Sequence, residues 1–251
     1  MDKLINNSEN KLIPPIYMKT DLEEFWPEDR VFYILASNGL FLCRNQKFFI
    51  SCIPANNWPS ALEEQETFLK VGYPKLPRRL LELAVGFFDV IYSIYRAEAA
   101  VLLLWDRIKK RYRLITPPQR STVFQSWSGK EFPINVKYEL PINLAENLYV
   151  IGDLHCHCEA GAYSSMTDKN DESYRAGLHI VVGRIHQEPP EFHIESVVDG
   201  ERFKIMPESI LEGYNHRRKG IPHEWINQVE IETVQSNQGY TYQSHNEDKE
   251  E

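Results

Sequence analysis

The stretch DLHCHCEAGAYSSMTD, residues 153–168, decides how we interpret this chain. It begins inside NLYVIGDLHCH, residues 147–157, whose apolar character predicts a β-strand. Residues i and i+2 of a strand point to the same face, so His155 and His157 are expected side by side. Two neighbouring imidazoles are what a protein zinc site requires.

Ser165 and Asp168 follow, three residues apart, at the start of a predicted helix over residues 165–176. This spacing puts both side chains on one face of the helix. Asp168 then supplies a third metal ligand beside the two histidines. Two histidines and one carboxylate leave a fourth position for water, which is typical of catalytic rather than structural zinc. The sequence therefore predicts one zinc ion per chain.

A catalytic zinc site also needs a nearby group that moves protons to and from the water. Glu98 is the best candidate, because it lies between the apolar segments LLELAVGFFDVIYSIY (80–95) and AAVLLLW (99–105). A lone carboxylate is costly in such surroundings. Asp153, two residues before His155, is a weaker candidate that would hydrogen-bond a ligand imidazole from behind. A turn residue at the end of the strand is its ordinary alternative.

Taken singly, each of these features has an ordinary structural explanation. Taken together, His155-Cys156-His157, seven residues, Ser165, two residues and Asp168 resemble the JAMM motif of JAB/MPN-domain metalloproteases. The likeness covers about residues 77–210, and SSMTDKNDESYRAGLHIVVGRIHQEPPEFHI (164–194) resembles prokaryotic JAB proteins in particular.

The resemblance implies an α/β fold with a JAB/MPN-like mixed β-sheet flanked by helices. It implies zinc on His155, His157 and Asp168, with Glu98 as the proton shuttle and Ser165 as a stabiliser of the oxyanion. It also implies hydrolysis of the peptide or isopeptide bond after a ubiquitin-like modifier, as in a deubiquitinase. Expected partners are that modifier and its conjugates, with modifier-activating and conjugating enzymes encoded nearby.

The chain departs from the family pattern at four positions. Cys156 and Cys158 stand where the family usually has Ser or Thr and then Pro, and Ala99 and Ala100 replace glycines that are common there. Strand alternation predicts that Cys156 points away from the histidines and that Cys158 shares their face if the strand continues. The HCHC run thus leaves a structural four-ligand zinc or a catalytic cysteine as alternatives.

Two other functions remain open from the sequence. Asp153, His155 and His157 also resemble the D-x-H-x-H opening of PHP phosphoesterases and amidohydrolases. That barrel takes roughly 200 residues or more, and only 94 residues follow His157. The second alternative is an inactive MPN scaffold that binds a ubiquitin-like partner.

The remaining chain predicts three parts: a β-rich accessory module with a polar arm (1–75), the metalloprotease domain (76–235) and a disordered tail (236–251). Within the module we expect a loose arm over 1–20, a three-stranded meander over about 31–53 turning at Asn38-Gly39, and a short helix over 60–69. In the domain, Pro77 predicts the start of a helix that ends near Tyr95. Further hairpins are expected around 106–113 and at Asp199-Gly200.

Composition excludes several classes of protein. The 28 basic and 36 acidic residues give a net charge of −8, which disfavours nucleic acid as a partner. No signal segment is visible, and the most apolar stretch, 80–95, contains Glu82 and Asp89, so we expect no membrane span. Four cysteines are too few for a disulfide scaffold. These features predict a cytoplasmic protein.

Overall fold

The structure is a computed structural model that describes residues 14–20, 26–59, 62–173 and 175–235. It divides into two compact units, residues 1–68 and 69–251, which are described separately here. The predicted boundary at residue 75 falls a few residues later, because Tyr73 already packs against the core of the second unit. The predicted tail, 236–251, and residues 1–13 of the predicted arm lie outside the described residues.

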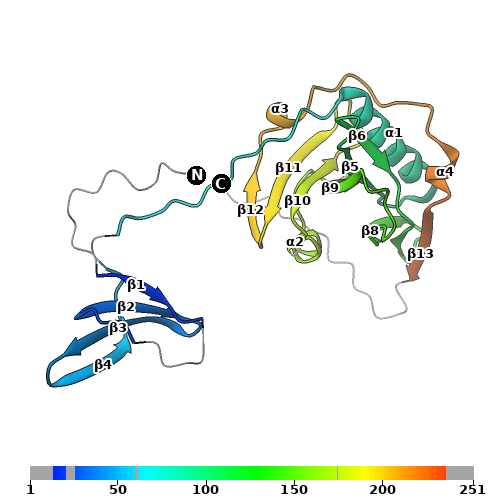
Figure 1. Ribbon diagram of the computed structural model, residues 1–251. Coiled ribbons are helices and arrows are strands. Elements are labelled where there is room, and N and C mark those ends of the chain that lie inside the picture. Colours follow the sequence, from blue (N-terminus) through cyan, green and yellow to red (C-terminus); the bar gives the residue numbers. More distant parts are fainter. Residues whose placement is uncertain (1–13, 21–25, 60–61, 174, 236–251) are drawn as a thin grey trace. The chain divides into compact units, whose positions relative to one another are not determined.

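Unit 1 is a four-stranded sheet in the order β1-β2-β3-β4 (Figure 1). Its strands are β1 (Ile16–Met18), β2 (Val31–Ala36), β3 (Gly39–Gln46) and β4 (Phe49–Pro54). The meander predicted over residues 31–53 is confirmed by β2, β3 and β4. The loose arm predicted over 1–20 is wrong at β1, which pairs in parallel with β2. Tyr17 explains the difference, since its ring packs edge-on against the buried Phe32 at 5.8 Å.

The first hairpin turns one residue earlier than its sequence signal. Ala36 pairs with Gly39, so Ser37 and Asn38 form the loop and Gly39 begins β3 with a φ of 135°. The second hairpin has the expected geometry. Asp199 and Gly200 connect β11 (Glu191–Val198) to β12 (Glu201–Lys204) with φ values of 51° and 86°.

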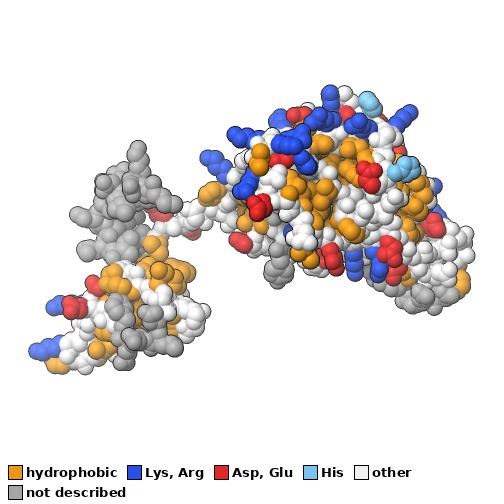
Figure 2. Space-filling view, turned by 45° about the vertical axis from the view of Figure 1, so that its right-hand side comes forward, with side chains coloured by type: hydrophobic (Ala, Val, Ile, Leu, Met, Phe, Trp, Pro, Cys, Tyr) orange, Lys and Arg blue, Asp and Glu red, His pale blue; other side chains and the backbone are white. Residues whose placement is uncertain are grey.

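The helix predicted over residues 60–69 is wrong. Residues 62–69 carry no helix, and Leu62 and Phe68 are 44% and 72% exposed. Helices this short are marginal in water unless they pack against other elements. These side chains are not buried, so no tertiary packing supports a helix here. Figure 2 shows apolar side chains at the surface of unit 1. Phe48 and Ile50 are 89% and 63% exposed.

Unit 2 is a strand-rich mixed α/β structure with few helices. Its six-stranded sheet has the order β12-β11-β10-β9-β5-β6, and a three-stranded sheet has the order β13-β7-β8. The β9–β10 and β7–β13 pairs are parallel, and the other pairs are antiparallel. The remaining strands are β5 (Ala100–Asp106), β6 (Arg111–Ile115), β7 (Gln119–Gln125), β8 (Glu131–Tyr138), β9 (Leu148–Cys156), β10 (Gly177–Gly183) and β13 (Val229–Gln235).

The helices are α1 (Arg78–Tyr95), α2 (Met166–Glu172), α3 (Pro207–Ile210) and α4 (His223–Ile226) (Figure 1). The predictions of a mixed α/β class, of the helix after Pro77 and of the hairpin around residues 106–113 are confirmed. The helix predicted over 165–176 ends earlier, at Glu172. No helix within the described ranges is long and apolar enough to cross a membrane.

The core of unit 2 lies between α1 and one face of the six-stranded sheet. Phe88 of α1 packs in one cluster with Leu103 of β5, Leu154 of β9 and Ile180 of β10. Alternate strand residues belong to the opposite face, which therefore carries Asp153, His155 and His179. The candidate site is thus built on the face that α1 leaves free.

Candidate metal centre

The end of β9 positions both histidines. His155 is the Cα partner of Ala100 on β5 and of Val181 on β10. One residue past the strand, the His157 N–H donates to the Val182 carbonyl at 2.9 Å, which keeps the chain extended beside β10. Continuing the antiparallel β5–β9 register places Glu98 across from His157. Three segments distant in the sequence therefore meet at this end of the sheet.

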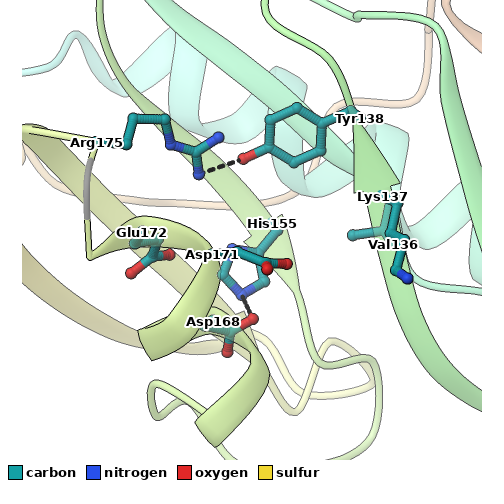
Figure 3. Close-up of a pocket in the computed structure, with 8 residues that line it drawn as sticks. All are labelled: Val136, Lys137, Tyr138, His155, Asp168, Asp171, Glu172 and Arg175. Atoms are coloured by element: carbon teal, nitrogen blue, oxygen red, sulfur yellow. Dashed lines mark hydrogen bonds and ion pairs between the residues drawn. The ribbon is translucent and has the colours of Figure 1, made fainter.

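Asp168 completes a group of three possible ligands. Its Oδ1 lies 3.5 Å from His155 Nε2, and its Oδ2 lies 3.2 Å from His157 Nε2. The ligand atoms of all three residues lie within 4.8 Å of one another. Figure 3 shows the His155 ring and the Asp168 carboxylate facing each other at the cavity. The sequence predicted these three residues as the metal ligands, and the structure brings them together.

A capping box holds Asp168 in this position. Ser165 is the N-cap of α2, its Oγ accepts the Asp168 N–H at 3.2 Å, and Asp168 Oδ2 accepts the Ser165 N–H at 2.7 Å. Reciprocal bonds of this kind satisfy donors that a helix start otherwise leaves unpaired. The carboxylate is therefore fixed at the helix start, with both oxygens near the imidazoles.

The electrostatics of the group favour a cation. Burial opposes the charged form of His155, but Asp153 and Asp168 outweigh it and hold its pKa well above the usual range. Burial likewise acts to raise the pKa of Asp168, and hydrogen bonds from His155 and His157 overcome it and lower the pKa. The His155 Nε2 atom is buried, and the Asp168 carboxylate lies 3.5 Å from it. A buried imidazole nitrogen beside a carboxylate fits a metal ion, which would take the place of the proton between them.

Glu98 and Ser165 face the same cavity as the metal ligands. This cavity of about 400 Å³ is lined by Glu98, His157, Ser165 and Asp168, among others. Burial raises the pKa of Glu98 to about 7, against the opposing influence of His157. A carboxyl group with this pKa can both accept and release a proton near neutral pH. The two predicted catalytic residues are thus brought to the predicted metal ligands.

Asp153 links His155 to a buried charge network that the sequence analysis missed. One carboxylate oxygen lies 3.7 Å from His155 Nδ1, and the other accepts from Arg175 at 2.8 Å and lies 2.9 Å from His179 Nδ1. Arg175 also donates to the Tyr138 hydroxyl (Figure 3). Asp153 therefore lies behind His155, at a distance longer than the predicted hydrogen bond.

A second group of possible ligands, Asp153, Glu172 and His179, lies in this network. Both ring nitrogens of His179 face acceptors, Asp153 Oδ2 at 2.9 Å and the Arg175 carbonyl at 3.1 Å. The imidazole therefore donates from both nitrogens and has no lone pair for a metal. Glu172 Oε2 also accepts a hydrogen bond from the Arg202 guanidinium at 2.6 Å. Positively charged side chains of the protein therefore already neutralise the two carboxylates. We interpret the group as a structural ion network. The charged residues of this stretch follow no regular spacing, so no pattern in the sequence indicates the network.

The cysteines do not join the metal ligands. Cys156 points into the core beneath α1, as predicted from strand alternation. Cys158 was expected on the histidine face only if the strand continued, and it does not continue. The strand ends at Cys156, and Cys158 takes a φ of 51°, which turns its sulfur to within 3.8 Å of the Cys156 sulfur. Neither of the two possible ligand groups found among the described residues contains a cysteine.

The arrangement combines a three-ligand group, a carboxyl group with a raised pKa and a hydroxyl around one cavity. These are the parts that metal-assisted hydrolysis uses. Comparisons with protein-family models and with curated proteins find no match for the chain.

Proposed function

We propose that the protein is a zinc-dependent hydrolase of the JAB/MPN type that cleaves the peptide or isopeptide bond after a ubiquitin-like modifier. The observation that carries the proposal is that His155, His157 and Asp168 come together, and that two of them, His157 and Asp168, line one cavity with Glu98 and Ser165. The spacing of these residues along the sequence supports the same activity through its resemblance to the JAMM motif.

His155, His157 and Asp168 are the residues that would hold the zinc ion. When bound, zinc supplies Lewis acidity, which polarises a carbonyl and lowers the pKa of water towards ~7. Metal ligation takes neutral imidazoles, so both histidines would hold the ion in their neutral form. Asp153 then orients His155 from behind the site.

Glu98 takes a proton from the attacking water and later delivers it to the leaving amine. Its raised pKa suits both steps. Ser165 Oγ accepts the Asp168 N–H, which leaves its own hydrogen available to donate to the developing oxyanion. Fixed donors of this kind stabilise the transition state without reorganisation.

The edge of β8 offers a place for an extended substrate tail. β8 is the edge strand of its sheet, and its residues line the cavity beside Glu98 and a second cavity of about 390 Å³ beside His155. Asp168 lines both cavities. A tail that adds to this edge as a strand would pass the metal ligands. The turn around residues 106–113 lines neither cavity.

The fold favours this activity over the PHP alternative. A PHP enzyme places its histidines on the first strand of a barrel, and a β/α barrel is built from parallel strands. The histidine strand β9 instead has an antiparallel neighbour, β5. Phosphoesterase activity without peptide cleavage would nevertheless overturn the proposal.

Metal content and cleavage provide the test. Purified wild type should carry one zinc per chain and release the group that follows a glycine-ended ubiquitin-like protein, in a fusion or a lysine-linked conjugate. Chelation should abolish cleavage, and added zinc should restore it. His157→Ala should lose zinc, and equal zinc in both proteins would refute the ligand assignment. Tight modifier binding without cleavage would favour the scaffold alternative.

A further inference from the structure

Two cysteines of unit 1 face each other across neighbouring strands, far along the chain from the metal ligands. Cys43 of β3 and Cys52 of β4 are direct Cα partners. Their sulfur atoms lie 3.2 Å apart. Cys43 is fully buried, whereas Cys52 is exposed, so a reagent in solution reaches one sulfur of the pair directly.

The backbone register suits a covalent link between them. The Ala55 N–H donates to the Leu40 carbonyl, which makes residues 40 and 55 a hydrogen-bonded pair. Hydrogen-bonded and non-hydrogen-bonded pairs alternate along an antiparallel ladder, so Cys43 and Cys52 form a non-hydrogen-bonded pair. The Cα atoms of such a pair lie about 4.5 Å apart, within the range that disulfides span. A disulfide here needs no backbone movement.

We propose that Cys43 and Cys52 form a redox-sensitive modification site, at which a small disulfide oxidant converts the two thiols into a cross-strand disulfide. This site is independent of the proposed hydrolase activity. The thiolate of Cys52 attacks one sulfur of oxidised glutathione, and the bond between the two glutathione sulfurs breaks as one glutathione leaves. Cys43 gives up its proton to water and attacks the Cys52 sulfur, which expels the second glutathione. The protein loses two electrons and two protons, and one oxidised glutathione becomes two reduced ones.

The environments of the two thiols set this order of attack. Burial, with a further contribution from Cys52, raises the pKa of the Cys43 thiol to about 12. The exposed Cys52 is therefore the sulfur that meets the oxidant, and Cys43 resolves the mixed disulfide from 3.2 Å away. The pair Cys156 and Cys158 lacks this access, since both side chains are fully buried.

The test uses the full chain equilibrated with mixtures of reduced and oxidised glutathione, followed by alkylation of the remaining thiols and peptide mass analysis. A peptide pair linked through Cys43 and Cys52 is expected, with Cys156 and Cys158 still alkylated after denaturation. Hydrogen exchange of β3 and β4 amides should slow by up to about 100-fold, as expected for closing a loop of about ten residues.

A matched pair of variants isolates the geometry. Cys52→Ser should abolish the link. Adding Ser51→Cys to that variant restores a thiol one residue away, at a half-buried position that strand alternation turns to the opposite face. It should restore no link. Glutathione remaining on Cys52, a disulfide between chains, or four free thiols in excess oxidant would each overturn the proposal. Equal linking of the Ser51→Cys/Cys52→Ser protein would also overturn it.

Discussion

Glu98 is the residue on which the proposed chemistry depends without being a metal ligand. Replacing it by Gln keeps the size and polarity of the side chain but removes its ability to take a proton. We expect Glu98→Gln to retain zinc and to lose turnover by roughly 10²–10⁴-fold, the usual contribution of a positioned acid or base. Metal analysis and cleavage of a modifier fusion measure the two effects separately.

The chain provides a matched control for this variant. Glu159 lines the same cavity but is exposed and follows the ligand strand. Glu159→Gln should therefore retain both zinc and turnover. Wild-type turnover in Glu98→Gln would show that another group carries the proton.

Asp106 makes a testable contribution to stability in acid. Its buried carboxylate accepts the Lys109 N–H and the Asn147 side chain, each at 3.0 Å, and lies 3.3 Å from Arg113. The Lys109 hydrogen bond, with the contributions of Asn147 and Arg113, outweighs burial and lowers its pKa. A pKa lower in the folded than in the unfolded state stabilises the fold above about pH 4, and this contribution is lost as the pH falls further.

Asp106→Asn should therefore weaken the decline of stability in acid. The expected result is a smaller drop in the denaturation midpoint between about pH 6 and about pH 3 than in wild type. An identical pH profile in both proteins would mean that the carboxylate is not held in its charged form by these contacts.

The clustering of His155, His157 and Asp168 could be predicted from the sequence because strand alternation and helix spacing are local properties. His155 and His157 need only a strand, and Ser165 with Asp168 needs only a helix start. The partners of Asp153 could not be predicted in this way. Arg175 and His179 reach it through the parallel pairing of β9 with β10 and the path of the chain between α2 and β10, which are tertiary features. The position of Cys158 depended on where β9 ends, and the loop that follows sets that end.

At the scale of elements, the contact between β9 and β10 depends on Gly152. A Cβ atom added at this position would lie 1.8 Å from the Leu178 carbonyl oxygen, which is backbone and cannot swing away. The β5–β9 register also shifts here, between Leu103 and Leu104. This irregularity precedes Asp153 and His155, so it helps to set the face on which they emerge.

Gly152→Ala should therefore disturb the metal centre from a distance. We expect a destabilisation of about 1–3 kcal/mol, typical of forced overpacking, together with reduced zinc content because His155 shifts. Chemical denaturation and metal analysis measure these changes. Gly220→Ala is the control, since a Cβ there meets nothing within 4 Å, and it should change stability by less than about 0.5 kcal/mol. Equal behaviour of the two variants would contradict the role given to Gly152.

The strands and α1 could be predicted because their apolar periodicity is strong and most of these side chains are buried. The helix prediction at 62–69 failed because the apolar residues there are exposed. The local sequence does not reveal that no other element packs against them. β1 failed for the opposite reason: three residues, Ile16–Met18, are too few for a periodic signal, and their pairing with β2 supplies the order.

At the scale of the molecule, the division into two units predicts that the site functions without unit 1. Residues 62–70 carry no helix or strand and are mostly exposed, whereas Tyr73 and Leu76 pack in the core of unit 2. Limited proteolysis should therefore cut before Tyr73. The fragment 69–251 should keep the zinc content of the whole protein. Loss of zinc on cleavage would show that unit 1 contributes to the site.

The capping box at α2 gives one carboxylate two tasks, and these tasks are thermodynamically coupled. Asp168 Oδ2 both accepts the Ser165 N–H and faces His157. A metal ion bound to this oxygen would change the strength of its hydrogen bond to the Ser165 N–H. Conversely, fraying of the helix start would move the Asp168 carboxylate away from the histidines. The free energy of metal binding therefore includes the free energy of ordering the first turn of α2. Metal affinity should then follow the local helical equilibrium of residues 166–172, so that this short helix sets how readily the protein gains and loses its ion.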